Sequence, residues 1–251
     1  MPIERNRIDY RVSDEATRVK RAWWFNRGMP NHLSVGSVLI GAMGNHWRPG
    51  CYDAVKAMAN HTFEQGYQVT LYEQPDRCFN PGDALGSMRN EIYMLALAEG
   101  YQYILYVDND VKPSPEVLVE LMEQHVPSPV APKPRFANGQ VFDNIHASML
   151  EPGMYMVGSC ILSMILFPSV VLRPFWRGDF WEDAIGDDEE YHFDKLYRAT
   201  GHRPFVNARV EVEIMEPPHF PLDARPKGRQ MATGAGKGNP LQNLTIIRGG
   251  Q

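Results

Sequence analysis

Residues 101–110, YQYILYVDND, form an apolar run that ends abruptly in acid. A short apolar run of this kind favours a strand buried on both faces, as in a parallel sheet. Its last residues, Asp108, Asn109 and Asp110, would then lie at the carboxyl end of the strand, where ligands of open α/β sheets bind. The stretch therefore predicts a parallel sheet and a site at one edge of it.

The segments before this strand alternate between strand-like and helix-like patterns. Val35 to Met43 is an apolar run ending in small residues, and residues 67–73 (YQVTLYE) alternate and are rich in β-forming residues. Helices are expected over about 50–66 and 84–100, each closed by a glycine. The first helix has a candidate buried stripe of Val55, Met58, Ala59 and Phe63.

The segments after the acidic triplet continue the alternation. EVLVELMEQH (116–125) is expected to be a helix, with Ser114 as N-cap and Pro115 at the first helical position. VAPKPRF (130–136) and MVGSCILSMILF (156–167) suggest strands, and a late helix ends near Gly201. This order predicts an α/β fold with a mostly parallel central sheet flanked by helices.

The length and composition suit one main domain. The chain has 251 residues, of which 43% are hydrophobic, and a net charge of -5 that does not favour a polyanionic partner. We expect residues 1–34 to be an extension packed on the core, 35–216 to form the domain, and 217–251 to be a C-terminal loop or tail rich in Pro, Gly, Lys and Arg.

Cysteine content and hydropathy indicate the cellular compartment in which the protein is expected. The three cysteines are widely separated, which argues against a disulfide scaffold and a zinc ribbon. The first residues are too polar for a secretory signal, and the longest apolar run, over 154–172, is interrupted by Gly, Ser and Pro. We therefore expect a cytoplasmic protein with no membrane span.

The pair Asp108 and Asp110 is a candidate metal site. Two carboxylates at alternate positions can both reach one hard divalent cation, such as Mg²⁺ or Mn²⁺, if the strand gives way to a turn there. A metal so held would stabilise the negative charge that develops on a leaving nucleoside diphosphate. A solvated turn is the alternative for this short motif taken alone.

The residues around this pair carry a family resemblance. A helix with Arg89-Asn90, then Ala96 and Gly100, then YILYVDNDVKPSPEVL, resembles the central region of GT-A fold glycosyltransferases. The resemblance covers roughly 35–210 in its order of elements and implies a single Rossmann-like GT-A domain. It implies a metal-dependent, family-2-like glycosyltransferase that moves a sugar from a nucleotide diphosphate sugar to a hydroxyl acceptor with inversion, using Mn²⁺ or Mg²⁺. The acceptor class stays open between a glycan, a small molecule, a protein and a nucleic acid.

The same resemblance assigns a donor site. Strand-end residues would line the nucleoside pocket, Arg89 would lie near the pyrophosphate, and a tail lysine could fold over the phosphates. The implied donor-binding residues are Ala42, Met43, Gly44, Glu73, Arg89, Asn109 and Lys237. GAMGNHW stands where the family often has a proline after the first strand, which leaves the base contacts open. A surface salt bridge is the alternative role for Arg89.

A second acidic cluster, GDDEEY (186–191), precedes the late helix. It resembles the acidic pair and aromatic residue with which the family begins such a helix. In inverting members this acid takes the proton from the acceptor hydroxyl, which makes Asp188 the first candidate for the general base and Asp187 the second. Acids that stabilise the helix dipole are the alternative interpretation.

Further candidates lie on either side of this cluster. His219, in EPPHFP, matches the place where many family members supply a histidine to the metal. Trp176, Trp181 and Tyr191 flank the cluster and could either stack on a sugar ring or belong to the core.

Two other functions are compatible with an Asp-x-Asp motif. A phosphatase-like or nucleotidyltransferase-like enzyme is one, although phosphatases of that type place the motif on the first strand and follow it with Thr, whereas Val111 follows here. A noncatalytic nucleotide-sugar-binding module is the other, and it would bind the donor without consuming it. GAGKGNP lacks the spacing of a P-loop, which argues against an NTPase.

Overall fold

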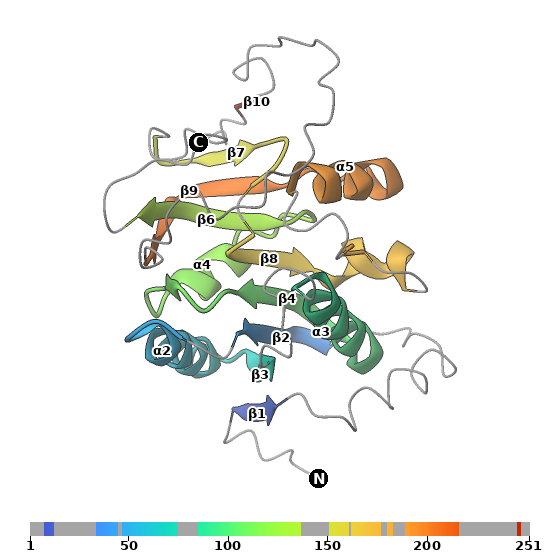
Figure 1. The fold of residues 1–251 in the computed structure, drawn as a ribbon. Helices are drawn as coiled ribbons and strands as arrows, with labels where there is room; N and C mark the ends of the chain where they lie inside the picture. The colour runs from blue at the N-terminus through green and yellow to red at the C-terminus, as the bar shows by residue number, and fades with distance from the viewer. Residues whose placement is uncertain are drawn as a thin grey trace, which may run out of the picture.

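The computed structural model describes residues 8–12, 34–44, 47–74, 85–136, 151–160, 162–176, 180–182, 189–215 and 245–246. These residues form an α/β fold around one central sheet (Figure 1). The strands are β1 (Asp9–Val12), β2 (Ser34–Met43), β3 (Gln68–Gln74), β4 (Tyr101–Val107), β5 (Val111–Lys112), β6 (Val130–Phe136), β7 (Met154–Met156), β8 (Met164–Pro168), β9 (Phe205–Ile214) and β10 (Thr245–Ile246). The helices are α2 (Cys51–Glu64), α3 (Leu85–Glu99), α4 (Val117–Met122), α5 (Glu189–Thr200) and the 3₁₀ helix η2 (Ser169–Phe175).

The sheet has the strand order β1-β3-β2-β4-β8-β6-β9-β7-β10, with β5 paired to β9. The strands β1, β3, β2 and β4 are parallel, and Ala42 is in register with both Glu73 and Val107. Beyond β4 the sheet is mixed, because β8 inserts antiparallel between β4 and β6. The expected α/β class with a central sheet flanked by helices is confirmed. The expectation of a mostly parallel sheet holds for the half that leads into the acidic triplet.

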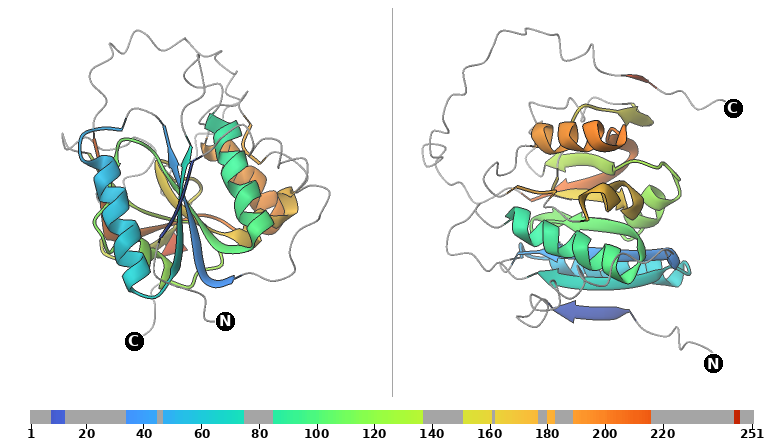
Figure 2. Two further views of the ribbon diagram at one scale, coloured as in Figure 1. Left: turned by 90° about the horizontal axis from the view of Figure 1, so that it is seen from below. Right: turned by 90° about the vertical axis from the view of Figure 1, so that its right-hand side faces the viewer.

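Helices cover both faces of the sheet. Figure 2 shows α2 on one side and α3 with α5 on the other. In β4, Ile104 and Tyr106 join the core under α3, whereas Leu105 and Val107 join the core under α2 and α4. Burial on both faces explains why this strand is a continuous apolar run rather than an alternating one.

The helices follow the sequence predictions with two differences. In α2, Val55, Met58 and Ala59 are fully buried, but Phe63 is only half-buried and Thr62 is buried instead, its hydroxyl donating to the carbonyl oxygen of Met58 at 2.8 Å. The predicted helix over 116–125 is shorter, since α4 has six residues and begins after Glu116 rather than at the predicted proline. Glycines end α2, α3 and α5 with φ angles of 92°, 77° and 76°.

Residues from both predicted flanking segments pair with the sheet. β1 adds an edge strand beside β3, and β10 pairs antiparallel with β7. The boundaries at 34 and 216 remain predictions. Among the described residues, none of the helices has the length and apolar character needed to span a bilayer.

Gly41 of β2 packs against Ile92 of α3. A Cβ atom at Gly41 would lie 2.6 Å from Cδ1 and 2.9 Å from Cγ2 of Ile92, a fully buried β-branched side chain. We therefore predict that Gly41→Ala lowers the free energy of unfolding by about 1–3 kcal/mol through overpacking. Urea denaturation measures the change. Gly158→Ala is the control, because a Cβ there would meet no atom within 4 Å; equal stability of the two variants would contradict the prediction.

Candidate functional site

The acidic triplet forms a turn between β4 and β5 at the carboxyl end of the parallel strands. Its backbone is held by three other segments of the chain. The bonds are Asp108 N–H to Ser163 O at 2.8 Å, Arg48 N–H to Asn109 O at 3.0 Å and Met215 N–H to Asp110 O at 2.8 Å. Backbone groups of neighbouring segments therefore anchor the turn at all three of its residues.

The Asp110 carboxyl group is shielded from solvent. Burial raises its pKa above the usual range, against smaller opposing effects of its own backbone N–H and of the Arg48 charge. Its Oδ1 atom is buried and has no hydrogen-bond partner among the described residues. A buried carboxylate oxygen left in this way is unfavourable unless a cation or a donor reaches it.

Asp108 faces a buried cation. Its Oδ1 lies 3.8 Å from the Nη2 atom of Arg89, and the two side chains are 24% and 3% exposed. The surface-salt-bridge alternative for Arg89 is therefore wrong: α3 delivers a nearly buried guanidinium to the end of β4. A guanidinium is the side chain best suited to bind a polyanion such as a pyrophosphate.

Gly44 and Asn109 are neighbours at this edge. Gly44 has a φ of 102°, and a Cβ atom there would lie 2.9 Å from Nδ2 of Asn109. The side chains of Ala42 and Met43 are buried in the two cores, and Glu73 is half-buried beside Ala42 on β3. The fold thus brings the predicted donor residues of three adjacent strand ends to one edge of the sheet.

The carboxyl groups of Asp108 and Asp110 fit a hard divalent cation by ligand type, since both offer oxygen atoms. Within the described ranges, no group of three or more His, Cys, Asp or Glu side chains is placed to hold a metal ion. Four residues predicted for the site lie outside the described residues: Asp187, Asp188, His219 and Lys237.

A cluster of buried hydrogen bonds that the sequence did not predict adjoins Arg89. Asn90 makes two hydrogen bonds with the backbone of Trp181, one from its Nδ2 to the carbonyl oxygen at 2.7 Å and one to its Oδ1 from the N–H at 2.9 Å. The Tyr106 hydroxyl donates to the backbone oxygen of Arg89 at 3.1 Å. Burial raises the pKa of Tyr106 far above its usual range, so this hydroxyl stays neutral. An asparagine on a buried helix face was the only signal in the sequence.

The aromatic candidates separate into core and surface. Trp176 and Trp181 are 7% and 1% exposed, so both belong to the core and neither can stack on a sugar. Tyr191 is 39% exposed and donates its hydroxyl to Glu182 at 3.1 Å. Glu182 also accepts from Lys195, and this hydrogen bond lowers the pKa of Glu182.

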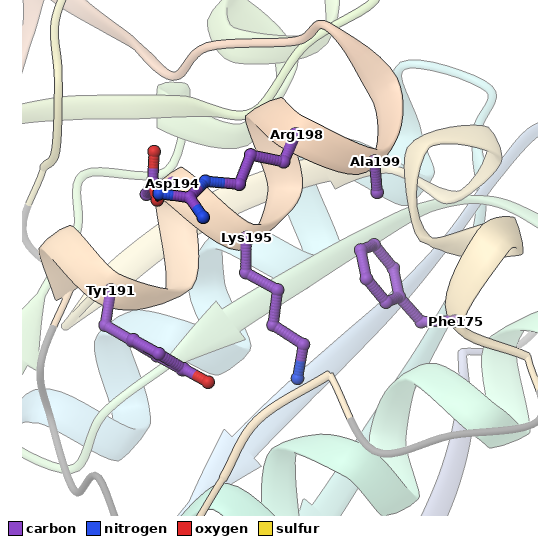
Figure 3. Close-up of a pocket in the computed structure, with 6 residues that line it drawn as sticks. All are labelled: Phe175, Tyr191, Asp194, Lys195, Arg198 and Ala199. Carbon is purple, nitrogen blue, oxygen red and sulfur yellow. The ribbon is translucent and has the colours of Figure 1, made fainter.

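A surface pocket of about 350 Å³ lies between α5 and η2. Figure 3 shows Phe175 of η2 facing the side chains of α5 across it. Its lining residues are Phe175, Tyr191, Asp194, Lys195, Arg198 and Ala199. Lys195 and Asp194 are paired with Glu182 and Arg198, so the charges around the pocket are largely compensated. Asp108 and Asp110 do not line it.

Comparison with known proteins gives structural similarity only. No protein-family model matches the chain, and no curated protein matches it. Among solved structures, GalNAc-T7 crystallised with UDP, GalNAc and Mn²⁺ has a TM-score of 0.48 at 10% identity, covering 74% of this chain and 44% of that one.

Two further similar structures are glycosyltransferases by their descriptions. One takes part in glycosylating the major capsid of PBCV-1 and has a TM-score of 0.41 at 11% identity, covering 72% of this chain and 96% of that one. The other is the catalytic domain of Drosophila beta1,4galactosyltransferase 7 in complex with xylobiose, with a TM-score of 0.40 at 13% identity, covering 68% and 65%. Similarities this distant do not identify an activity for this chain.

The burial of Asp110 generates a stability prediction. We expect Asp110→Asn to raise the free energy of unfolding of the metal-free protein at neutral pH, because it removes a carboxylate that burial disfavours. Chemical denaturation in the presence of a chelator measures this. Asp53→Asn is the matched control, since the Asp53 side chain is 80% exposed. A loss of stability in Asp110→Asn would show that the native structure depends on this carboxylate.

Proposed function

We propose that this protein is a metal-dependent glycosyltransferase that uses a nucleotide diphosphate sugar as donor and a hydroxyl group as acceptor. The observation that carries the proposal is a nearly buried guanidinium, Arg89, that faces Asp108 at the carboxyl end of a parallel strand. Two residues further on, the buried Oδ1 atom of Asp110 has no hydrogen-bond partner among the described residues. A site with two acids and one cation suits a ligand that is itself a metal complex of a diphosphate, because the acids bind the metal and the cation binds a phosphate oxygen.

Asp108 and Asp110 are the proposed metal ligands. Mn²⁺ or Mg²⁺ bound there would neutralise the charge on the leaving nucleoside diphosphate. His219 is the proposed third protein ligand. Its assignment is supported by its place in the sequence EPPHFP, which follows β9 and resembles the place where many family members supply a histidine to the metal.

The remaining donor contacts are proposed on the same edge. Arg89 would bind the pyrophosphate, and Gly44 with Asn109 would form the wall nearest to it. Gly44 fits this role because its lack of a side chain keeps Asn109 close. Ala42, Met43 and Glu73 would border the nucleoside, and Lys237 would cover the phosphates from the tail.

Asp188 is the proposed general base, with Asp187 as the second candidate. A carboxylate accepts the proton of the acceptor hydroxyl as that oxygen attacks the sugar carbon and the bond from the sugar to the diphosphate breaks. Both residues directly precede α5, the helix that bears the pocket with Phe175 and Tyr191. This position in the sequence supports acceptor chemistry at the start of α5, and a base that acts on the acceptor hydroxyl is the role that an inverting mechanism requires.

Metal-dependent nucleotide binding is the first test. We predict that Asp108→Asn and Asp110→Asn abolish binding of UDP or GDP in the presence of Mn²⁺, because each removes one charged oxygen ligand of the metal. Titration calorimetry with and without Mn²⁺ measures this. The exposed Asp53→Asn variant should bind as the wild type does. Wild-type affinity in both site variants would show that Asp108 and Asp110 do not bind the metal.

Turnover tests the base. We predict that Asp188→Asn leaves donor affinity unchanged and lowers the transfer rate by roughly 10²–10⁴-fold, the range for a positioned base. The rate is measured as donor consumption with an acceptor found by screening. Asp53→Asn is the control, because Asp53 is an exposed carboxylate on α2 that does not line this pocket. Normal turnover in Asp187→Asn and Asp188→Asn would place the base elsewhere. A donor that is bound but never consumed by the wild type would favour a noncatalytic binding module.

A further inference from the structure

The Arg89 guanidinium lies against an aromatic ring as well as a carboxyl group. Its Cζ atom is 5.1 Å from the centre of the Trp181 ring, and its Nη2 atom is 3.8 Å from Oδ1 of Asp108. An arginine within about 6 Å of an aromatic ring is attracted by the electron-rich face, most strongly where water is excluded. Arg89 meets that condition, since its side chain is 3% exposed.

Trp181 is held in place by the same helix that carries Arg89. Asn90, the next residue on α3, makes both of its hydrogen bonds to the backbone of Trp181. The indole Nε1–H of Trp181 donates to the Tyr106 hydroxyl at 3.4 Å, and that hydroxyl donates to the backbone oxygen of Arg89. These hydrogen bonds join Trp181, α3 and β4 in a closed network at the backbone of Arg89.

This network, with the Trp181 ring that it holds, restricts the Arg89 side chain, which would otherwise have several rotamers. An arginine loses much conformational freedom when it is fixed, and a ligand that must order it binds more weakly. A ring already fixed beside the guanidinium removes part of that loss before the ligand arrives. Trp181 itself is 1% exposed, so it acts on a ligand only through Arg89.

We propose that Trp181 is a positioning residue that holds the Arg89 guanidinium ready for the donor diphosphate. The inference rests on the proposed function, because it takes the diphosphate as the ligand of Arg89. Asn90 fixes Trp181, and Trp181 fixes Arg89. Segment 180–182 thereby acts on donor binding without touching the donor.

A double-mutant cycle tests the coupling. The affinity for UDP with Mn²⁺ is measured by calorimetry in wild type, Trp181→Leu, Arg89→Ala and the double variant. Loss of the ring should weaken binding by roughly 3- to 30-fold when Arg89 is present. In the Arg89→Ala background the same change should alter the affinity by less than about twofold, because the residue through which it acts is gone.

Matched variants separate positioning from damage to the core. Phe193→Leu removes a buried ring of the same core, one that stacks on Phe167, and should leave UDP affinity unchanged. If Trp181→Leu does not fold, Trp181→Phe and Asn90→Ala take its place in the cycle, and both should weaken binding only when Arg89 is present. Melting temperatures of all variants are measured in parallel.

The outcomes distinguish the inference from the function on which it rests. Equal weakening by Trp181→Leu in both backgrounds overturns the positioning role and leaves the diphosphate site intact. Wild-type affinity in Arg89→Ala rejects the donor role of Arg89, and with it the positioning role. Weakening that requires Arg89, with Phe193→Leu unaffected, supports the inference.

Discussion

The structure depends on one constraint, which is the burial of β4 on both faces. The strand must end at a point where charged side chains can be tolerated. Up to Val107 the strand contributes to both cores, and at Asp108 the ladder with β8 ends in a single backbone hydrogen bond to Ser163. The chain then turns and returns as β5 against β9. Carboxyl groups therefore sit at the border between a dry interior and the loops that follow the parallel strands.

This border explains why the charges come in opposed pairs. A buried carboxyl group or guanidinium alone would be strongly unfavourable, and each makes the other tolerable. Arg89 reaches Asp108 from α3, while the Oδ1 atom of Asp110 has no hydrogen-bond partner among the described residues. A cation-bearing ligand would supply the partner that this oxygen lacks there. Natural proteins commonly accept such a loss of stability where it serves binding.

The sequence predicts local features well and distant ones poorly. The apolar run of β4, the stripe of α2 and the glycines that end three helices follow from periodicity and backbone sterics, so their positions could be predicted. The antiparallel insertion of β8 could not, because no residue near β8 specifies its partner. The contact between Asn90 and Trp181 joins residues 91 positions apart and leaves no local pattern. The roles of Asp188 and His219 stay predictions, since both lie outside the described residues.

The backbone anchoring of the acidic turn has a consequence for sequence divergence. Ser163 contributes only its carbonyl oxygen to the turn's three external hydrogen bonds, and Arg48 and Met215 contribute only N–H groups. Any residue except proline can supply an N–H, and any residue can supply a carbonyl oxygen. The residues that carry these groups can therefore change during evolution while the turn keeps its backbone anchors, except where a side chain has a second role, as the Arg48 charge does in lowering the pKa of Asp110.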